Sequence, residues 1–319
     1  MKAAIYDHEG PPEVLHLVDA PDPDVAPGEV LIRVEAISIE GGDLISRHST
    51  PPRAPGHILG YAAAGTVLAV GDDVMDRKVG DRVTSWNLEG SHAELRAVPW
   101  RQTWLLPPDV GVAQAAAIPI GFGTAHYCLF TRGGLSKPSS VLVQGAAGGV
   151  GIAAVQLARA AGANVIAVAR GEDRAKKLAE LGASRIIDPS VEPVAAAVRE
   201  VTGERGVDLV IDPVGSTLAT SLDVLRDEGT LVAVGNAGGA SLTADLWPAV
   251  QRNQSIHGVF MGPLLTRPVV RDAVDTMLAD LSKNRLVVPI DRRFPLSEAA
   301  AAHRYAENER VFGRIILIP

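Results

Sequence analysis

The sequence predicts an α/β protein in which an all-β unit is followed by a doubly wound parallel sheet. Up to about Asp109, short β-branched segments are broken every few residues by Gly or Pro, as expected for strands separated by turns. From about Ser139, apolar strands alternate with helices, which is typical of a parallel sheet covered on both faces. The chain of 319 residues also exceeds a typical single core, so two domains are expected.

The first region contains the clearest strands of the all-β unit. Residues 30–34 and 63–70 are rich in β-branched and small apolar side chains, and Gly71, Gly80 and Gly90 interrupt the sequence that follows. Short strands separated by such turns predict a barrel-like unit.

The second region continues as a series of strands and helices. The expected strands are 141–143, 165–168, 185–187, 208–211, 230–234 and 255–260. The Ala-rich segment 149–161 predicts the first helix, and 172–181, which Gly182 closes, predicts the second. After Pro263 we expect a helix over 271–281, a strand near 287–288, a helix over 297–307 and a last strand over 314–318.

Composition excludes several classes of protein. Hydrophobic residues make up 47% and charged residues 21%, which indicates an ordered globular chain. The net charge of −7 without a basic cluster argues against nucleic acid or an anionic membrane surface as a partner. The single cysteine, Cys128, excludes an intramolecular disulfide and a Cys-rich zinc lobe, so we expect a cytoplasmic protein. We find no signal-peptide core and no apolar run of the roughly 18 to 20 residues that span a bilayer.

A glycine-rich segment between the first strand and the first helix of the second region carries the strongest chemical signal. It reads Gln-Gly-Ala-Ala-Gly-Gly-Val-Gly over 144–151, with Ala146, Gly148 and Gly151 in the G-x-G-x-x-G register. Backbone amides at a helix N-terminus bind diphosphate, and small residues let the ligand approach. We therefore expect Ala147 to Gly151 (Ala147, Gly148, Gly149, Val150 and Gly151) to bind a dinucleotide.

The end of the next strand indicates which dinucleotide binds. NAD-binding proteins usually place an Asp or Glu there for the ribose 2′-hydroxyl, whereas this chain has Ala169. Arg170 and Arg174 follow, and guanidinium groups suit a 2′-phosphate. The alternative is that both arginines are ordinary solvated side chains. NADPH is therefore expected, with NADH less favoured.

Several further segments carry a family resemblance over nearly the whole chain. They are 27–30, 60–71, 79–83, 123–125, the glycine-rich segment, 229–232 and 312–317. With them, the sequence resembles the medium-chain dehydrogenase/reductase superfamily, and within it the zinc-free quinone-oxidoreductase branch. The resemblance implies a GroES-like β-barrel catalytic domain over 1–119, a Rossmann NADPH-binding domain over 120–262 and a C-terminal return to the catalytic domain over 263–319. It also implies an active site in the cleft between domains and a homodimer that pairs the sixth Rossmann strand.

The resemblance also allows zinc to be tested by position. Zinc-dependent relatives bind the metal with a Cys, a His and a Cys, where this chain has Glu40, Tyr61 and Ile120. A carboxylate beside a phenol and a hydrocarbon does not supply a tetrahedral zinc site, so no metal is expected. His57, His92 and His126 are interpreted as surface or core residues rather than ligands.

Tyr61 and Glu40 are the candidate catalytic residues. Tyr61 would polarise a carbonyl, and Glu40 would donate a proton if burial raised its pKa. The alternatives are that Tyr61 is pocket wall and that Glu40 is a structural hydrogen-bond acceptor. Relatives usually carry Asn at position 40, often Tyr at 45 and frequently Tyr at 189, where this chain has Glu40, Ile45 and Pro189.

The remaining cofactor candidates come from family positions. Thr124 is expected near the nicotinamide, and Gly235 and Asn236 follow the fifth strand at the edge where such ligands bind. Phe260 and Met261 follow the sixth strand and either line the nicotinamide ring or belong to the core. Near the tail, Arg310 and Arg314 are interpreted as surface charges.

These features together predict a zinc-independent, NADPH-dependent oxidoreductase. Hydride would pass to a small-molecule electron acceptor, a quinone or an α,β-unsaturated carbonyl, because charge then flows onto an oxygen that hydrogen-bond donors stabilise. One alternative is an NADPH-binding regulatory or structural protein with little turnover, since the substrate positions depart from the family. An enoyl-thioester reductase is the other.

Overall fold

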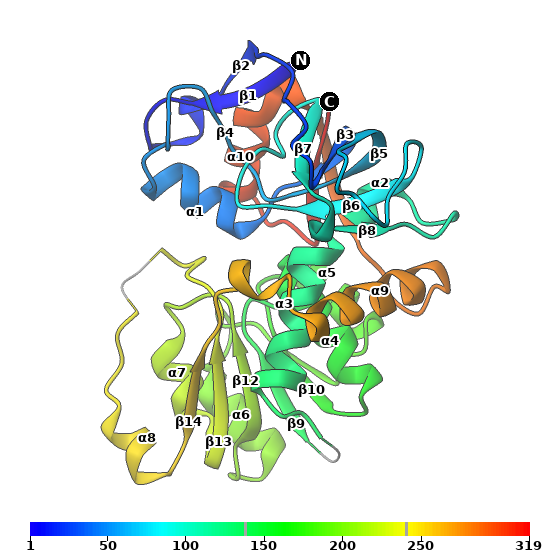
Figure 1. Cartoon of the computed structure of the whole chain (residues 1–319). Coiled ribbons are helices and arrows are strands. Elements are labelled where there is room, and N and C mark those ends of the chain that lie inside the picture. Colours follow the sequence, from blue (N-terminus) through cyan, green and yellow to red (C-terminus); the bar gives the residue numbers. More distant parts are fainter. Residues whose placement is uncertain (137–138, 240–241) are drawn as a thin grey trace. The chain divides into compact units, whose positions relative to one another are not determined.

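The computed structural model describes residues 1–136, 139–239 and 242–319, and the chain divides into two compact units (Figure 1). Unit 1 comprises Met1–Gly123 and Gly262–Pro319, and unit 2 comprises Thr124–Met261.

Unit 1 is built on β-sheets. Among the described residues, β2, β1 and β4 form a three-stranded sheet, and a larger one has the order β15-β16-β3-β5-β6-β8, with β7 also paired to β3. Its strands are β1 (Lys2–Tyr6), β2 (His16–Asp19), β3 (Glu29–Ser38), β4 (His57–Ile58), β5 (Ala62–Val70), β6 (Arg82–Trp86), β7 (Leu95–Pro99), β8 (Thr103–Leu105), β15 (Ile290–Pro295) and β16 (Arg314–Ile318). The strands expected in the N-terminal region are present, but the region is not all-β, because it contains the helix Gly41–Ser49, which was not predicted.

The strand expected near residues 287–288 is a wrong prediction. β15 begins at Ile290, opposite Arg314 of β16. The preceding Pro289 has no N–H to donate to a sheet ladder, while its carbonyl oxygen accepts a bond from the Arg314 amide at 3.0 Å. Two adjacent valines therefore suggested a strand that in fact starts after the proline.

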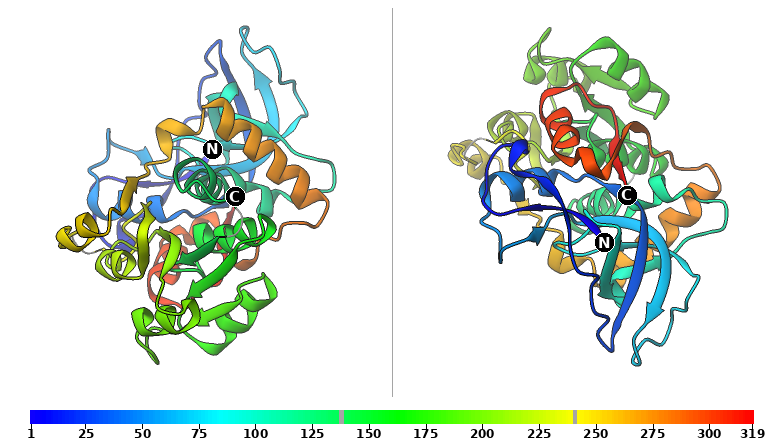
Figure 2. Two further views of the ribbon diagram at one scale, coloured as in Figure 1. Left: turned by 90° about the horizontal axis from the view of Figure 1, so that it is seen from below. Right: turned by 90° about the horizontal axis from the view of Figure 1, so that it is seen from above.

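The C-terminal segment completes the core of unit 1. Leu317 of β16 and Ala302 of α10 share a buried cluster with Ile37 and Leu59 from the N-terminal half. Figure 2 shows the red end of this segment near the blue N-terminal strands. The helices of unit 1 are α1 (Gly41–Ser49), α2 (Val112–Ala116), α9 (Pro268–Ser282) and α10 (Ala299–Asn308).

Unit 2 is a doubly wound domain. Its described residues form a six-stranded parallel sheet with the order β11-β10-β9-β12-β13-β14. The strands are β9 (Ser140–Val143), β10 (Asn164–Val168), β11 (Arg185–Ile187), β12 (Val207–Asp212), β13 (Leu225–Ala233) and β14 (Ser255–Gly258). Since the strand order reverses at β9 and β12, a ligand crevice is expected at the carboxyl edge of these two strands. The α/β fold class is confirmed, although β14 is two residues shorter than predicted.

The helices of unit 2 connect these strands. They are α3, which starts at the unit boundary (Gly123–His126), α4 (Gly149–Ala160), α5 (Glu172–Glu180), α6 (Val194–Thr202), α7 (Leu218–Asp223) and α8 (Trp247–Gln251). Two π-helical turns, Ile118–Phe122 and Tyr127–Arg132, flank α3 and were not predicted from the sequence. Within the described ranges, no helix has the length and apolar character needed to cross a bilayer.

Candidate functional site

The glycine-rich segment forms a tight turn from β9 into α4. Gly148 is the N-cap of α4, and the first helical bond runs from the Ile152 amide to the Gly148 carbonyl oxygen at 2.8 Å. The amides of Gly149 to Gly151 lie in the first turn, where no intrahelical acceptor exists for them. They are the donors that a diphosphate would meet.

Gly151 and Gly145 are required in this turn for two different physical reasons. A Cβ atom on Gly151 would lie 2.5 Å from the Gly145 carbonyl oxygen and 2.6 Å from the Ala146 Cα, so only glycine lets α4 pack this closely on the turn. The left-handed backbone of the turn belongs to Gly145, with φ of 55°. Alanine is therefore tolerated at position 146, where the family pattern has its first glycine.

A buried carboxylate that the sequence analysis missed shapes the neighbouring loop. Asp212 ends β12, and its side chain accepts bonds from the amides of Val214 and Gly215 at 2.9 and 3.0 Å. The hydroxyl groups of Thr217 and Ser221 bond the same carboxylate at 2.8 and 2.7 Å. An Asp directly after an apolar strand and before Pro and Gly is a turn signal that would have identified it.

The loop after β13 brings the predicted residues Gly235 and Asn236 to the same edge of the sheet. The Asn236 carbonyl oxygen accepts the Gly239 amide at 3.0 Å, which shapes the loop. The side-chain Oδ1 of Asn236 is buried, and within the part of the chain that the structure describes it has no hydrogen-bond partner. Buried acceptors are normally satisfied, so this oxygen suits a ribose hydroxyl or an amide of a bound dinucleotide.

The arginines predicted to select NADPH lie at the start of α5. Arg170 is exposed and Arg174 is half-buried in the first helical turn. Of the acids close in sequence, Glu172 pairs with Lys176 at 2.8 Å, and Asp188 accepts the Gly171 amide at 2.7 Å.

The other predicted cofactor residues have different environments. Thr124 is buried in α3 as the first residue of unit 2. Met261 is also buried, whereas Phe260 is 70% exposed. An aromatic ring this exposed has surface to offer a ligand or a partner.

Tyr61 of unit 1 is half-buried, and its hydroxyl group lies 2.8 Å from the Ser46 Oγ. Its amide donates to the Asp43 Oδ1 at 3.1 Å, and its carbonyl oxygen accepts from the Arg96 Nη2 at 2.9 Å. Burial raises the pKa of Tyr61 further above neutral pH. Sequence reasoning identified Tyr61 but missed Ser46, Asp43 and Arg96.

The Glu40 side chain is buried, and its carboxylate forms an ion pair with Arg314. One carboxylate oxygen accepts the Ser38 hydroxyl group at 2.9 Å, and the other lies 2.6 Å from the Arg314 Nη2. Burial raises the pKa of Glu40 to about 7, although Arg314 and Ser38 oppose the rise. The interpretation of Arg314 as a surface charge is wrong: its side chain is buried because it is the counter-ion of the buried Glu40.

These contacts decide whether zinc fits the corresponding family positions. Glu40 already has a guanidinium partner, the Tyr61 hydroxyl group is bonded to Ser46, and Ile120 lies in the π-helical turn Ile118–Phe122. One carboxylate paired with a cation, one phenol and one hydrocarbon side chain do not fit a tetrahedral zinc ion.

The three histidines singled out from the sequence, His57, His92 and His126, lie in three different environments. His92 is buried, with its Nε2 3.1 Å from the His303 Nε2 and its Nδ1 3.2 Å from the Ser91 Oγ. His57 is partly buried beside Glu89, and the half-buried His126 ring lies 4.7 Å from the Phe130 ring, centroid to centroid. The interpretation of these histidines as surface or core residues agrees with these contacts.

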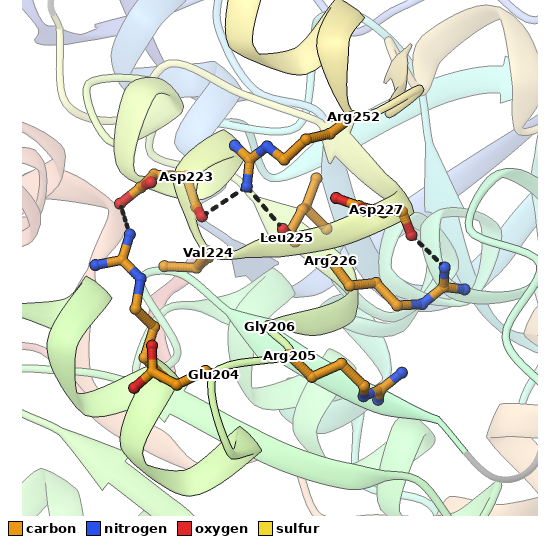
Figure 3. A pocket seen from close by; sticks show the side chains of 10 residues that line it. Glu204, Arg205, Gly206, Asp223, Val224, Leu225, Arg226, Asp227 and Arg252 are labelled. Carbon is orange, nitrogen blue, oxygen red and sulfur yellow. Dashed lines mark hydrogen bonds and ion pairs between the residues drawn. The ribbon is translucent and has the colours of Figure 1, made fainter.

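A cavity of about 460 Å³ lies in unit 2 around the amino ends of β12 and β13 (Figure 3). Four arginines line it: Arg199, Arg205, Arg226 and Arg252. Arg199 pairs with the Asp223 carboxylate at 2.7 Å, and Figure 3 shows Arg252 and Arg226 bonded to different acceptors. Arg252 donates to the Asp223 and Leu225 carbonyl oxygens at 3.2 and 3.1 Å. These guanidinium groups therefore stabilise the surrounding loops rather than converge on one ligand position.

Comparison with known proteins places these features in a family. Residues 26–108 match the family described as alcohol dehydrogenase GroES-like domain, and residues 149–279 match the family described as zinc-binding dehydrogenase. A quinone oxidoreductase of Pseudomonas aeruginosa is 34% identical, with 97% of each chain covered. The chain belongs to the medium-chain dehydrogenase/reductase superfamily, in its quinone oxidoreductase-like branch.

Other relatives of this superfamily differ greatly in length. The structure of an Escherichia coli quinone oxidoreductase complexed with NADPH matches with a TM-score of 0.93 and 30% identity, over 100% of both chains. The phthioceranic/hydroxyphthioceranic acid synthase of Mycobacterium tuberculosis is 34% identical over 91% of this chain, but the chain spans only 14% of that protein. Membership of this oxidoreductase family confirms the resemblance inferred from the sequence.

Proposed function

We propose that this protein is a zinc-independent, NADPH-dependent oxidoreductase that reduces a quinone or an α,β-unsaturated carbonyl compound. The observation that carries the proposal is the turn from β9 into α4, in which Gly151 packs against Gly145 and the first-turn amides have no helical acceptor. The Escherichia coli relative that was solved with NADPH supports the choice of cofactor.

The residues at the carboxyl edge of the unit 2 sheet fit a dinucleotide. The amides of Gly149 to Gly151 would bind the diphosphate, and Arg170 and Arg174 would bind the 2′-phosphate. The buried Asn236 Oδ1 would accept a hydrogen bond from a ribose hydroxyl or an amide. We propose the nicotinamide side to be lined by Thr124, Gly235, Phe260 and Met261.

The chemistry divides between the cofactor and the protein. Bound NADPH would supply the hydride. Tyr61, whose phenol is protonated at neutral pH, would donate a hydrogen bond to the oxygen on which negative charge develops. A conjugated acceptor suits such a donor, whereas a saturated ketone more strongly requires a Lewis acid.

Glu40 has two possible roles in this scheme. With its pKa raised to about 7 it would hold a proton in part of the molecules at neutral pH and would serve as a proton source. Its contacts with Ser38 and Arg314 favour the structural role, because both carboxylate oxygens are engaged.

Calorimetry with NADPH and NADH, followed by the loss of NADPH absorbance with a panel of acceptors, tests the proposal. The panel contains quinones, enones and an enoyl thioester. We expect NADPH to bind more tightly than NADH and to be oxidised with quinones or enones. Absence of binding to either nucleotide would overturn the oxidoreductase proposal, binding without oxidation would favour a regulatory or structural protein, and oxidation by the thioester alone an enoyl-thioester reductase.

We also propose that the protein is a cytoplasmic homodimer. β14 stands at one end of the strand order, and apolar side chains beside it are exposed, namely Ile256, Trp247 and Val250. A strand at a sheet edge offers unpaired backbone groups to a second copy. Sedimentation equilibrium of the purified chain tests the dimer, and a monomer at micromolar concentration would exclude it. The single Cys128 is a free thiol, as expected in a reducing compartment.

A further inference from the structure

We infer that Ser46 is a positioning residue for Tyr61: it bonds the phenol oxygen so that the phenol proton is directed to the oxygen of the electron acceptor. This inference rests on the proposed function and adds to it a residue that no sequence pattern indicated.

The hydroxyl pair supplies the first part of the argument. The two oxygens lie 2.8 Å apart, and either group can donate. When Ser46 donates, the phenol oxygen is an acceptor and its own proton is left for another partner. A phenol that accepts one hydrogen bond is also a stronger donor in the next one, because hydrogen bonds in a chain polarise each other.

The backbone of Tyr61 is held from both sides by buried ionisable side chains. The Asp43 carboxylate accepts the Tyr61 amide at 3.1 Å and the Glu40 amide at 2.8 Å. On the other side, the Arg96 guanidinium donates to the Tyr61 carbonyl oxygen at 2.9 Å. Since the Asp43 and Arg96 side chains are both buried, neither exchanges its partner with water, and the peptide groups around Tyr61 are fixed.

The Tyr61 ring is fixed by close packing on α1. A Cβ atom on Gly42 would overlap the Tyr61 Cε2, so the ring lies directly against the first turn of this helix. Ser46 lies four residues further along α1, which places it on the same face as Gly42. Backbone, ring and hydroxyl group are thus each held, which is the preorganisation that a hydrogen bond to a developing charge requires.

Exposure distinguishes Tyr61 from the neighbouring candidate. Glu40 is 2% exposed and both its carboxylate oxygens are engaged, whereas Tyr61 and Ser46 are half-buried. Of the two predicted catalytic side chains, Tyr61 is therefore the more exposed one.

Four variants of the full-length protein test the inference. They are Ser46→Ala, Ser46→Thr, Tyr61→Phe and the double variant Ser46→Ala/Tyr61→Phe, with Ser49→Ala at an exposed position of the same helix as the matched control. The measurements are kcat and KM with 2-methyl-1,4-naphthoquinone as the acceptor, the Kd for NADPH by calorimetry, and the Tm.

A positioning role predicts a specific pattern. Ser46→Ala should lower kcat about fivefold, the size of one hydrogen bond, and Tyr61→Phe about 100-fold. The double variant should match Tyr61→Phe, because Ser46 acts only through the phenol. Ser46→Thr should restore the rate, Ser49→Ala should leave it unchanged, and the Kd for NADPH and the Tm should stay at the wild-type values throughout.

The outcomes separate this inference from the proposed function. Wild-type kcat in Ser46→Ala, or an equal loss from Ser46→Ala with and without the Tyr61 hydroxyl group, would overturn the role of Ser46 while the reductase proposal stands. A wild-type protein that reduces no acceptor would overturn the proposed function, and the inference would fall with it.

Discussion

The dinucleotide turn of unit 2 and the Tyr61 region of unit 1 achieve rigidity in opposite ways. The turn relies on backbone: Gly151 allows α4 to approach Gly145, and main-chain amides are the proposed binding groups. The Tyr61 region relies on buried ionisable side chains, with Asp43 and Arg96 bonded to its peptide groups. A site built on backbone is sensitive to added volume, whereas a site built on buried charges is sensitive to the loss of a partner.

The two kinds of site also differ in how the chain encodes them. Eight consecutive residues, 144–151, form the turn, so the local sequence is sufficient to predict it. The Glu40–Arg314 pair joins the N-terminal half of the chain to β16, and Arg314 by itself was interpreted as a surface residue. Substitutions at Gly151, Arg314 and Arg170 test this contrast.

The largest effect is expected from Gly151→Ala in the backbone site. The added Cβ atom would lie 2.5 Å from the Gly145 carbonyl oxygen, so α4 or the turn must move. We expect a loss of at least about 100-fold in NADPH affinity and about 4 kcal/mol in unfolding free energy. Gly148→Ala is the matched control, because its Cβ atom would lie at 3.4 Å from the same oxygen and should leave the Tm nearly unchanged. Calorimetry and chemical denaturation measure both quantities, and wild-type NADPH binding in Gly151→Ala would contradict the role of this glycine.

Arg314→Met tests the buried-charge site and should have the next largest effect. Without the guanidinium, Glu40 loses the charge that opposes the rise of its pKa above 7, so the folded protein prefers the protonated carboxyl. A folded pKa above the unfolded value stabilises the protein at low pH, and this contribution is lost as pH rises through the folded pKa. The unfolding free energy should therefore fall from pH 5 to pH 9 by about 3 kcal/mol more than in the wild type.

The double variant Glu40→Gln/Arg314→Met sharpens that test. It removes the titrating carboxyl together with its partner, so the additional slope should disappear. Denaturant titrations at several pH values compare the three proteins. A steep slope that persists in the double variant would assign the pH dependence to another group.

The smallest effect is expected from Arg170→Ala, because one exposed arginine contributes a single charge to cofactor choice. We expect about a tenfold loss in NADPH affinity, from one charge-assisted contact, and an unchanged affinity for NADH. Lys176→Ala, another exposed cation of α5, serves as the control. Equal losses for both nucleotides would show that Arg170 does not meet the 2′-phosphate.

Local sequence predicted much of this protein. Alternating apolar strands and helices were sufficient for the parallel sheet of unit 2, and the glycine spacing was sufficient for the turn before α4, since periodicity and turn chemistry act over a few residues. Tyr61 and Glu40 were identified through family positions rather than through their surroundings. The strand predicted at 287–288 failed because pairing with β16, and not β-branched composition, decides where β15 begins.

The tertiary structure alone decided which polar groups are buried together. Arg314 was assigned to the surface, yet it lies in the core because folding brings it to Glu40. Ser46 meets the Tyr61 hydroxyl group, and Asp43 and Arg96 meet its backbone, through contacts that span from 15 to 35 residues of sequence. The residues that neighbour a charged side chain in the sequence do not indicate which distant residue will be its partner. Whether burying it stabilises or destabilises the chain depends on the distance to that partner, which only the folded arrangement determines.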